Sequence, residues 1–137
     1  MQFNLMPHRS TPPASPEFKV WANVDYAGAF GAAATLNIWF GVGAPASRFV
    51  IPEAPEPGRK NDLWQTTCFE AFLRPSGGEA YREWNFAPSG QWAAYDFSAY
   101  RQGMELGDKF IPVKNVFVPL WIKGQRWGNF ELAYRDD

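Results

Sequence analysis

Two glutamates stand on neighbouring segments whose residue alternation predicts β-strands. Glu70 lies in the segment 64–74 and Glu83 in the segment 79–86, and the four residues 75–78 between them are typical of a turn. If those four residues close a hairpin, Glu70 pairs directly with Glu83, with Cβ atoms about 5 Å apart. Opposed carboxylates repel each other, so we expect a shared proton, a cation or a ligand hydroxyl to compensate them.

A third strand pattern, 91–97, extends the same antiparallel meander and predicts which side chains share a face. With a four-residue turn at 87–90, Asn85 pairs with Trp92. The face that holds both glutamates is then polar with interleaved aromatic rings, and carries Glu70, Tyr81, Glu83, Asn85, Trp92 and Asp96. The opposite face is almost wholly apolar and is expected to be core, with Phe69, Ala71, Leu73, Trp84, Phe86, Ala93, Tyr95 and Phe97.

This mixture of acids, an amide and aromatic rings suits a carbohydrate ligand. Sugar hydroxyls need both acceptors and donors of hydrogen bonds, and the apolar faces of sugar rings stack on Trp or Tyr. Trp64 shares the polar face, and Arg59 is a cation that precedes it. The alternative is that both glutamates point into water, as surface glutamates usually do. The predicted ligand-binding residues are Trp64, Glu70, Glu83, Asn85, Tyr81, Trp92 and Arg59.

The elements that must position this face are strands and turns. Segments 18–26 and 34–42 alternate between apolar and polar residues, and the chain holds 12 Gly, 12 Pro and 18% aromatic residues. No segment of normal helix length has a 3.6-residue period. We expect an all-β fold, an antiparallel β-sandwich with little or no helix, in a single domain over residues 1–137. Residues 1–16 read as a Pro-rich extended lead-in, and residues 101–137 have a weaker pattern.

The composition excludes several function classes. The formal net charge is −1, which gives no basic surface for nucleic acid or anionic lipid. One Cys and one His form neither an internal disulfide nor a Cys/His zinc site. Residues 26–47 carry no charge, but the period of two within them favours a strand over a membrane span. The start of the chain lacks the apolar run of a signal peptide, so we expect a cytoplasmic location.

The segment from Asp62 to Met104 resembles the bacterial DOMON-like domains, which are related to the family 9 carbohydrate-binding modules. The runs LWQTTCFEAF and EWNFAPSGQWAAY carry the resemblance, which covers about the first three quarters of the chain. It implies a jelly-roll-like β-sandwich that binds a sugar or a haem and is not itself catalytic. The usual ending of the family does not match. The chain is then either a shortened member or one with an altered tail. Part of the ligand cleft would be missing or supplied by a second copy of the chain, and unpaired edge strands would favour a homodimer.

The resemblance also implies site residues. The sugar-binding modules carry a Trp six positions before a Glu at the ligand site, and Trp64 and Glu70 reproduce that spacing. The same modules use Arg-x-Asn on a later strand, where this chain has Glu83 and Asn85. The amide is kept and an acid replaces the cation. This departure changes the expected chemistry of the pocket but leaves its expected location unchanged.

Three alternatives to a carbohydrate-binding module remain open from the sequence. A haem-binding DOMON-type domain needs axial ligands, for which His8 with Met6 or Met104 is the available set. A retaining glycosidase fits two directly opposed glutamates, Glu70 and Glu83, with carboxyl groups near 5 Å apart. A protein-interaction domain fits exposed aromatic residues. The leading expectation is a binding module without cofactor or metal, and the sequence leaves calcium binding open.

Overall fold

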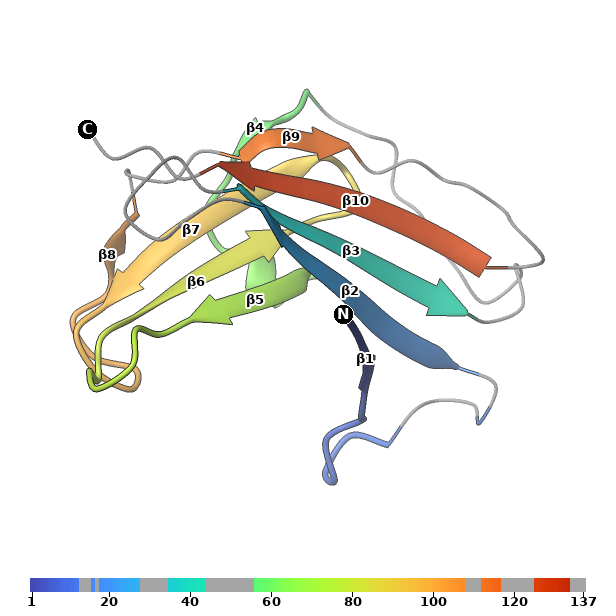
Figure 1. The fold of residues 1–137 in the computed structure, drawn as a ribbon, viewed down its shortest axis with the longest axis horizontal. Helices are drawn as coiled ribbons and strands as arrows, with labels where there is room; N and C mark the ends of the chain where they lie inside the picture. Colours follow the sequence, from blue (N-terminus) through green and yellow to red (C-terminus); the bar gives the residue numbers. More distant parts are fainter. Residues whose placement is uncertain are drawn as a thin grey trace.

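The computed structural model describes residues 1–12, 16, 18–27, 35–43, 56–107, 112–116 and 125–133 (Figure 1). Within them the chain forms strands joined by turns, with one turn of 3-10 helix, η2 (Leu63–Gln65). The strands are β1 (Gln2–Leu5), β2 (Lys19–Ala27), β3 (Thr35–Gly43), β4 (Gly58–Arg59), β5 (Phe69–Leu73), β6 (Tyr81–Phe86), β7 (Gln91–Phe97), β8 (Glu105–Leu106), β9 (Pro112–Val116) and β10 (Gln125–Ala133). None of the described helical segments is long and apolar enough to cross a membrane.

The strands form two sheets, and the predicted all-β fold is confirmed. Sheet A has the order β1-β2-β3-β10-β9, and every pair in it is antiparallel. Sheet B has the order β4-β7-β6-β5, and the short β8 also pairs with β7. The β4–β7 pair is parallel, and the other pairs of sheet B are antiparallel. Figure 1 shows β10 beside β3, far from it in the sequence.

The core lies between the two sheets. Sheet A contributes Ala22, Ile38 and Phe40, and sheet B contributes Trp84 and Phe86. All five are buried, and the Phe86 side chain is 0% exposed. Removing a Phe side chain from water contributes on the order of 2–3 kcal/mol, so these contacts hold the two layers together. The layering resembles that of a β-sandwich, and the jelly-roll form of the sandwich stays a prediction.

The lead-in predicted for residues 1–16 starts with a strand. Residues 2–5 form β1, which pairs with β2 at the edge of sheet A, where Leu5 is the partner of Val20. The ammonium group of Met1 also donates a hydrogen bond of 2.7 Å to the carbonyl of Val24. Its sequence, Gln-Phe-Asn-Leu, alternates between polar and apolar residues, but the run is only four residues long and all four are exposed.

The hairpin between β6 and β7 differs from the prediction by one residue. The Ala87 N–H donates to the Gln91 carbonyl at 2.9 Å, and the Gly90 N–H donates to the Ala87 carbonyl at 3.0 Å. The loop therefore holds three residues, 88–90, and Gly90 takes the left-handed conformation (φ 86°) that such loops require. The predicted four-residue turn is wrong, and Phe86, not Asn85, pairs with Trp92.

A shift of one residue moves every side chain of β7 to the opposite face. Trp92 packs against the core between the sheets, and Asp96 pairs across the same face with Arg82. Tyr95 and Phe97, predicted to be core on the inner face, lie instead on the outer face of sheet B, together with Ala93. The predicted composition of the two faces is therefore wrong for β7 and correct for β6.

The pairing register of β5 and β6 differs from the prediction by two residues. A shift of two leaves each side chain on the predicted face of the sheet. Glu70 pairs with Asn85, and Phe72 pairs with Glu83. The predicted direct opposition of the two glutamates is therefore wrong, and they are diagonal neighbours on one face. The cause is a longer connection at 74–80, in which Gly77 has φ 81°.

Candidate functional site

A groove of about 480 Å³ lies on the outer face of sheet B. This volume is within the range of small-molecule sites, about 300–1,000 Å³. Strands β5, β6 and β7 form its floor, and η2 and the segment 100–104 contribute its rim. Its aromatic lining residues are Trp64, Phe72, Tyr81, Tyr95, Phe97 and Tyr100, and the others are Glu70, Glu83, Arg101 and Met104.

The rings of the groove contact one another in a series. Tyr81 and Phe97 are partners on β6 and β7, and their rings stack with centroids 4.7 Å apart and an interplanar angle of 6°. Phe72 adds a tilted contact to Tyr81 at 6.2 Å. The backbone N–H of Arg101 donates to the Tyr81 hydroxyl at 3.3 Å and so ties the rim to the floor. These contacts give the groove a fixed aromatic surface.

The turn η2 positions Trp64 over this surface. Leu63 is buried among Ala93 and Tyr95, and its carbonyl accepts hydrogen bonds from the backbone and hydroxyl of Thr66 at 3.0 and 3.1 Å. The Trp64 ring then meets Tyr95 edge to face, with centroids 5.4 Å apart. Trp64 keeps 41% of its surface exposed, so one side of the ring is available to a ligand.

The segment before η2 is tied to the same tyrosine. The Asp62 N–H donates to the Tyr95 hydroxyl at 3.3 Å, and that hydroxyl donates to Asn61 Oδ1 at 3.5 Å. Burial, the main cause, raises the pKa of Tyr95 above its usual range. Tyr95 therefore keeps its proton at neutral pH and continues to hold the turn.

Glu83 is the more buried of the two acids. Burial raises its pKa, the hydrogen bond from Asn85 Nδ2 at 3.1 Å lowers it, and the charge of Glu70 raises it further. Asn85 itself is 0% exposed, and no described group is hydrogen-bonded to its Oδ1. Asn85 therefore orients Glu83 from a fully buried position and does not line the groove.

Glu70 is exposed and has the only cysteine as its neighbour. The Cys68 thiol donates to Glu70 Oε1 at 3.8 Å. Burial, followed by the charge of Glu70, raises the pKa of Cys68 to about 12. The sulfur therefore stays a thiol at neutral pH and is a poor nucleophile and a poor metal ligand.

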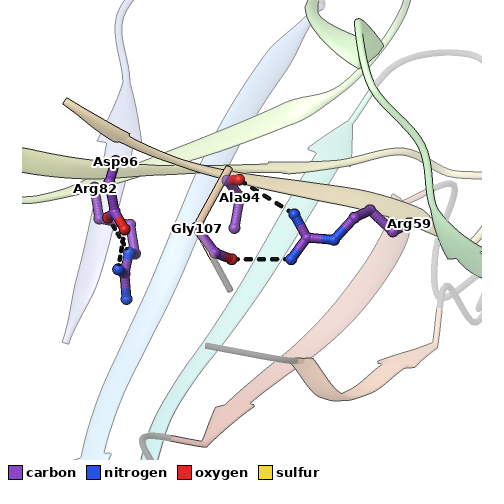
Figure 2. A network of polar contacts seen from close by, with 5 residues as sticks. All are labelled: Arg59, Arg82, Ala94, Asp96 and Gly107. Carbon is purple, nitrogen blue, oxygen red and sulfur yellow. Dashed lines mark hydrogen bonds and ion pairs between the residues drawn. The ribbon is translucent and has the colours of Figure 1, made fainter. Parts of the chain in front are cut away.

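Arg59 and Trp92 form a separate cluster away from the groove lining. The Arg59 guanidinium lies 4.6 Å from the centroid of the Trp92 ring. It donates to the carbonyl of Gly107 at 2.9 Å and to that of Ala94 at 3.5 Å (Figure 2). This arginine thus links β4 to β7 and to the end of β8. Its contacts are structural ones.

Figure 2 also shows Arg82 and Asp96 paired at a separate point on sheet B. Arg82 donates to both carboxylate oxygens through Nε and Nη2, a bidentate arrangement. The Asp96 predicted on the polar face is therefore engaged on the other face of the sheet.

Of the seven predicted site residues, the structure brings four together in the groove: Trp64, Glu70, Tyr81 and Glu83. A fifth, Asn85, donates a hydrogen bond to Glu83. Sequence reasoning missed the contributions of Tyr95, Phe97 and the rim residue Tyr100. The available signal for the first two was the sequence Pro-Ser-Gly at 88–90, which suits a three-residue loop with a left-handed Gly.

Of the residues named from the sequence as haem ligands, only Met104 lines the groove. His8 is exposed, and its Nδ1 lies 2.7 Å from Ser10 Oγ in the chain before β2. Met104 lines the groove, whereas His8 does not. Among the described residues there is also no group of three or more His, Cys, Asp or Glu side chains that could hold a metal ion.

Comparison with known proteins adds no relative to this description. No family model matches the sequence, and neither the curated proteins nor the solved structures contain a significant match to it. The resemblance to DOMON-like domains therefore stays a prediction from the residues that carry it.

Proposed function

We propose that this chain is a non-catalytic binding module whose groove on sheet B holds a small carbohydrate. The observation that carries the proposal is a half-exposed Trp64 ring in the same hollow as two carboxylates, Glu70 and Glu83. A sugar ring has an apolar face and a rim of hydroxyls, so it needs these two kinds of surface next to each other.

The groove supplies both kinds of surface. Trp64 stands on the rim, held by the buried Leu63, and offers a flat surface for stacking. Glu70 and Glu83 stand on the floor and accept hydrogen bonds from hydroxyl groups. The stacked rings of Tyr81 and Phe97 add apolar surface to the floor. The rings and Glu83 are held by protein contacts before a ligand arrives, which lowers the ordering cost of binding.

The glycosidase alternative was based on glutamates directly opposite each other, and the register of β5 and β6 does not place them so. The geometry of a retaining glycosidase requires carboxyl groups about 5 Å apart on the two sides of the scissile bond. Here Glu70 is the partner of Asn85, and both glutamates stand on the floor of one groove. Cys68 also donates its hydrogen bond to Glu70.

The test is calorimetric titration of the protein with a panel of monosaccharides and disaccharides. Trp64→Ala removes the stacking ring, and Tyr26→Ala is the matched control, since Tyr26 on β2 is 43% exposed against 41% for Trp64. We expect saturable binding that weakens about tenfold or more in Trp64→Ala and is unchanged in the control. Equal affinity in both variants, or no binding of any sugar, contradicts the proposal. A change of oligomeric state in Trp64→Ala without sugar binding supports a protein-interaction domain instead.

A further inference from the structure

The charge of the groove is unbalanced. Two carboxylates, Glu70 and Glu83, line it, and Arg101 is the only basic residue among the described residues that do so. The Arg101 guanidinium lies 5.2 Å from the centroid of the neighbouring Tyr100 ring. In the described part of the chain, neither glutamate has an ion pair with a basic side chain.

Two arginines on the strands of sheet B make contacts elsewhere. Arg82 alternates to the opposite face of β6 and pairs with Asp96. Arg59 donates to the carbonyl of Gly107 and stacks on Trp92. Neither of these arginines therefore neutralises the two acids, and among the described lining residues Arg101 is the one basic side chain beside them.

The rings around these acids favour the same kind of group. The faces of Trp and Tyr rings carry partial negative charge and attract cations, by about 0.5–1 kcal/mol at exposed sites and about 2 kcal/mol when desolvated. Trp64 and Tyr81 stand in the groove with Glu70 and Glu83. Burial and the charge of Glu70 already raise the pKa of Glu83, so its ionised form gains from a positive neighbour.

Glu83 is also held in a defined orientation for such a contact. Asn85 is fully buried and donates to Glu83 Oε1 at 3.1 Å, which leaves the other carboxylate oxygen for a donor in the groove. A carboxylate fixed in this way offers a specific acceptor, unlike a mobile surface glutamate.

We propose that the ligand of this groove is a positively charged amino sugar. Its ring stacks on Trp64, and its ammonium group lies between Glu70 and Glu83. This inference rests on the proposed function, because it names the class of carbohydrate that the same groove takes.

The experiment compares D-glucosamine with D-glucose and N-acetyl-D-glucosamine by calorimetric titration at a pH near 6, where alkyl amines are protonated. The last two sugars are neutral: glucose has a hydroxyl group in place of the amine, and N-acetyl-D-glucosamine has an uncharged amide with a larger substituent. We expect glucosamine to bind about tenfold more tightly than either, a difference equivalent to about 1.4 kcal/mol. The preference should shrink as salt is added, since it is electrostatic.

Three variants assign that preference to the groove. Glu70→Gln and Glu83→Gln keep hydrogen-bonding groups and remove one charge each, so both should reduce the preference for glucosamine. Glu79→Gln is the matched control, because Glu79 is exposed in the loop before β6 and does not line the groove. Trp64→Ala should weaken all sugars alike.

The outcomes separate the two proposals. Equal binding of glucose and glucosamine, or a preference that survives both groove variants, overturns the amino-sugar inference and leaves the carbohydrate module in place. No binding of any sugar overturns both. Both proposals are also overturned if tetramethylammonium binds as tightly as glucosamine and glucose does not bind. The groove would then be a cation site that does not recognise a sugar ring.

Discussion

Replacing Gly41 with Ala tests the packing of sheet A, because the structure leaves no room for a side chain there. Gly41 is the partner of Trp21 across the β2–β3 pair, and Trp21 is only 8% exposed. A Cβ atom at Gly41 would lie 2.5 Å from Trp21 Cζ2 and closer still to Cε2 and Nε1. Carbon atoms in contact lie about 3.5–4.0 Å apart, so the indole has to move by about 1 Å.

The cost of that movement follows from the density of the surroundings. Overpacking a well-packed site costs about 1–3 kcal/mol, and the lower backbone entropy of Ala returns up to about 1 kcal/mol. We expect a net loss of about 1–2 kcal/mol in the free energy of unfolding, measured by urea denaturation. Near-UV circular dichroism should also change, because a Trp ring changes its environment.

Two further variants make this prediction specific. Gly78→Ala is the matched control, since nothing lies within 4 Å of a Cβ atom there, and its stability should be unchanged or slightly higher. Trp21→Leu removes the ring that the added methyl group would strike, so the double variant should be less destabilised than the sum of the single ones. A Gly41→Ala protein with wild-type stability and an unchanged near-UV spectrum would refute the reasoning.

Three other predictions concern the acids, the thiol and the arginine. The pKa of Glu83 is raised in the folded state above its ordinary value of 4.5, so folding favours the protonated form and the protein loses stability as the pH rises through the raised pKa. The free energy of unfolding of Glu83→Gln, relative to that of the wild type, should therefore be higher at neutral pH than below pH 4.5. Urea denaturation of both proteins at both pH values checks this. Cys68, with its pKa raised to about 12, should react with iodoacetamide at neutral pH much more slowly in the folded than in the urea-unfolded protein. In folded Glu70→Gln it should react faster than in the folded wild type. Equal rates in the folded and unfolded wild type would contradict the burial of the thiol. Arg59→Met should lower the free energy of unfolding by about 1–2 kcal/mol through the lost hydrogen bond and cation–π contact, and leave sugar affinity unchanged. A loss of affinity at unchanged stability would return Arg59 to the binding site.

The sequence was most informative where alternation was long. The segment 91–97 was predicted with the bounds that β7 has, and β2 and β3 lie within one residue of their predicted positions. β4 and β8 have two residues each, which is too short for a period of two to be recognised. β1 and β9 exist because of their neighbours in sheet A, and that information is not local.

The candidate site depended on two loop lengths, and they had different consequences. An error of two residues at 74–80 kept Glu70 and Glu83 on one face, so that part of the groove was predicted. An error of one residue at 88–90 placed Trp92 on the groove face in the prediction, whereas in the structure Tyr95 lies there. The sequence Pro-Ser-Gly at 88–90 favours the three-residue loop, with Gly90 in the left-handed conformation. The role of Arg59 was beyond prediction because its partners come from β7 and from the residue after β8.

The position of β10 has a consequence for the order in which the protein folds. Gln125 pairs with Gly43, a residue 82 positions earlier, whereas strands β4 to β8 of sheet B all come from residues 58–106. Sheet B and the hairpin of β2 and β3 therefore leave the ribosome before the strand that lies between β3 and β9. During this interval β3 presents an unpaired row of N–H and C=O groups, to which a strand from another chain can bind. The rate at which β10 reaches β3 thus sets how long the nascent protein is exposed to aggregation.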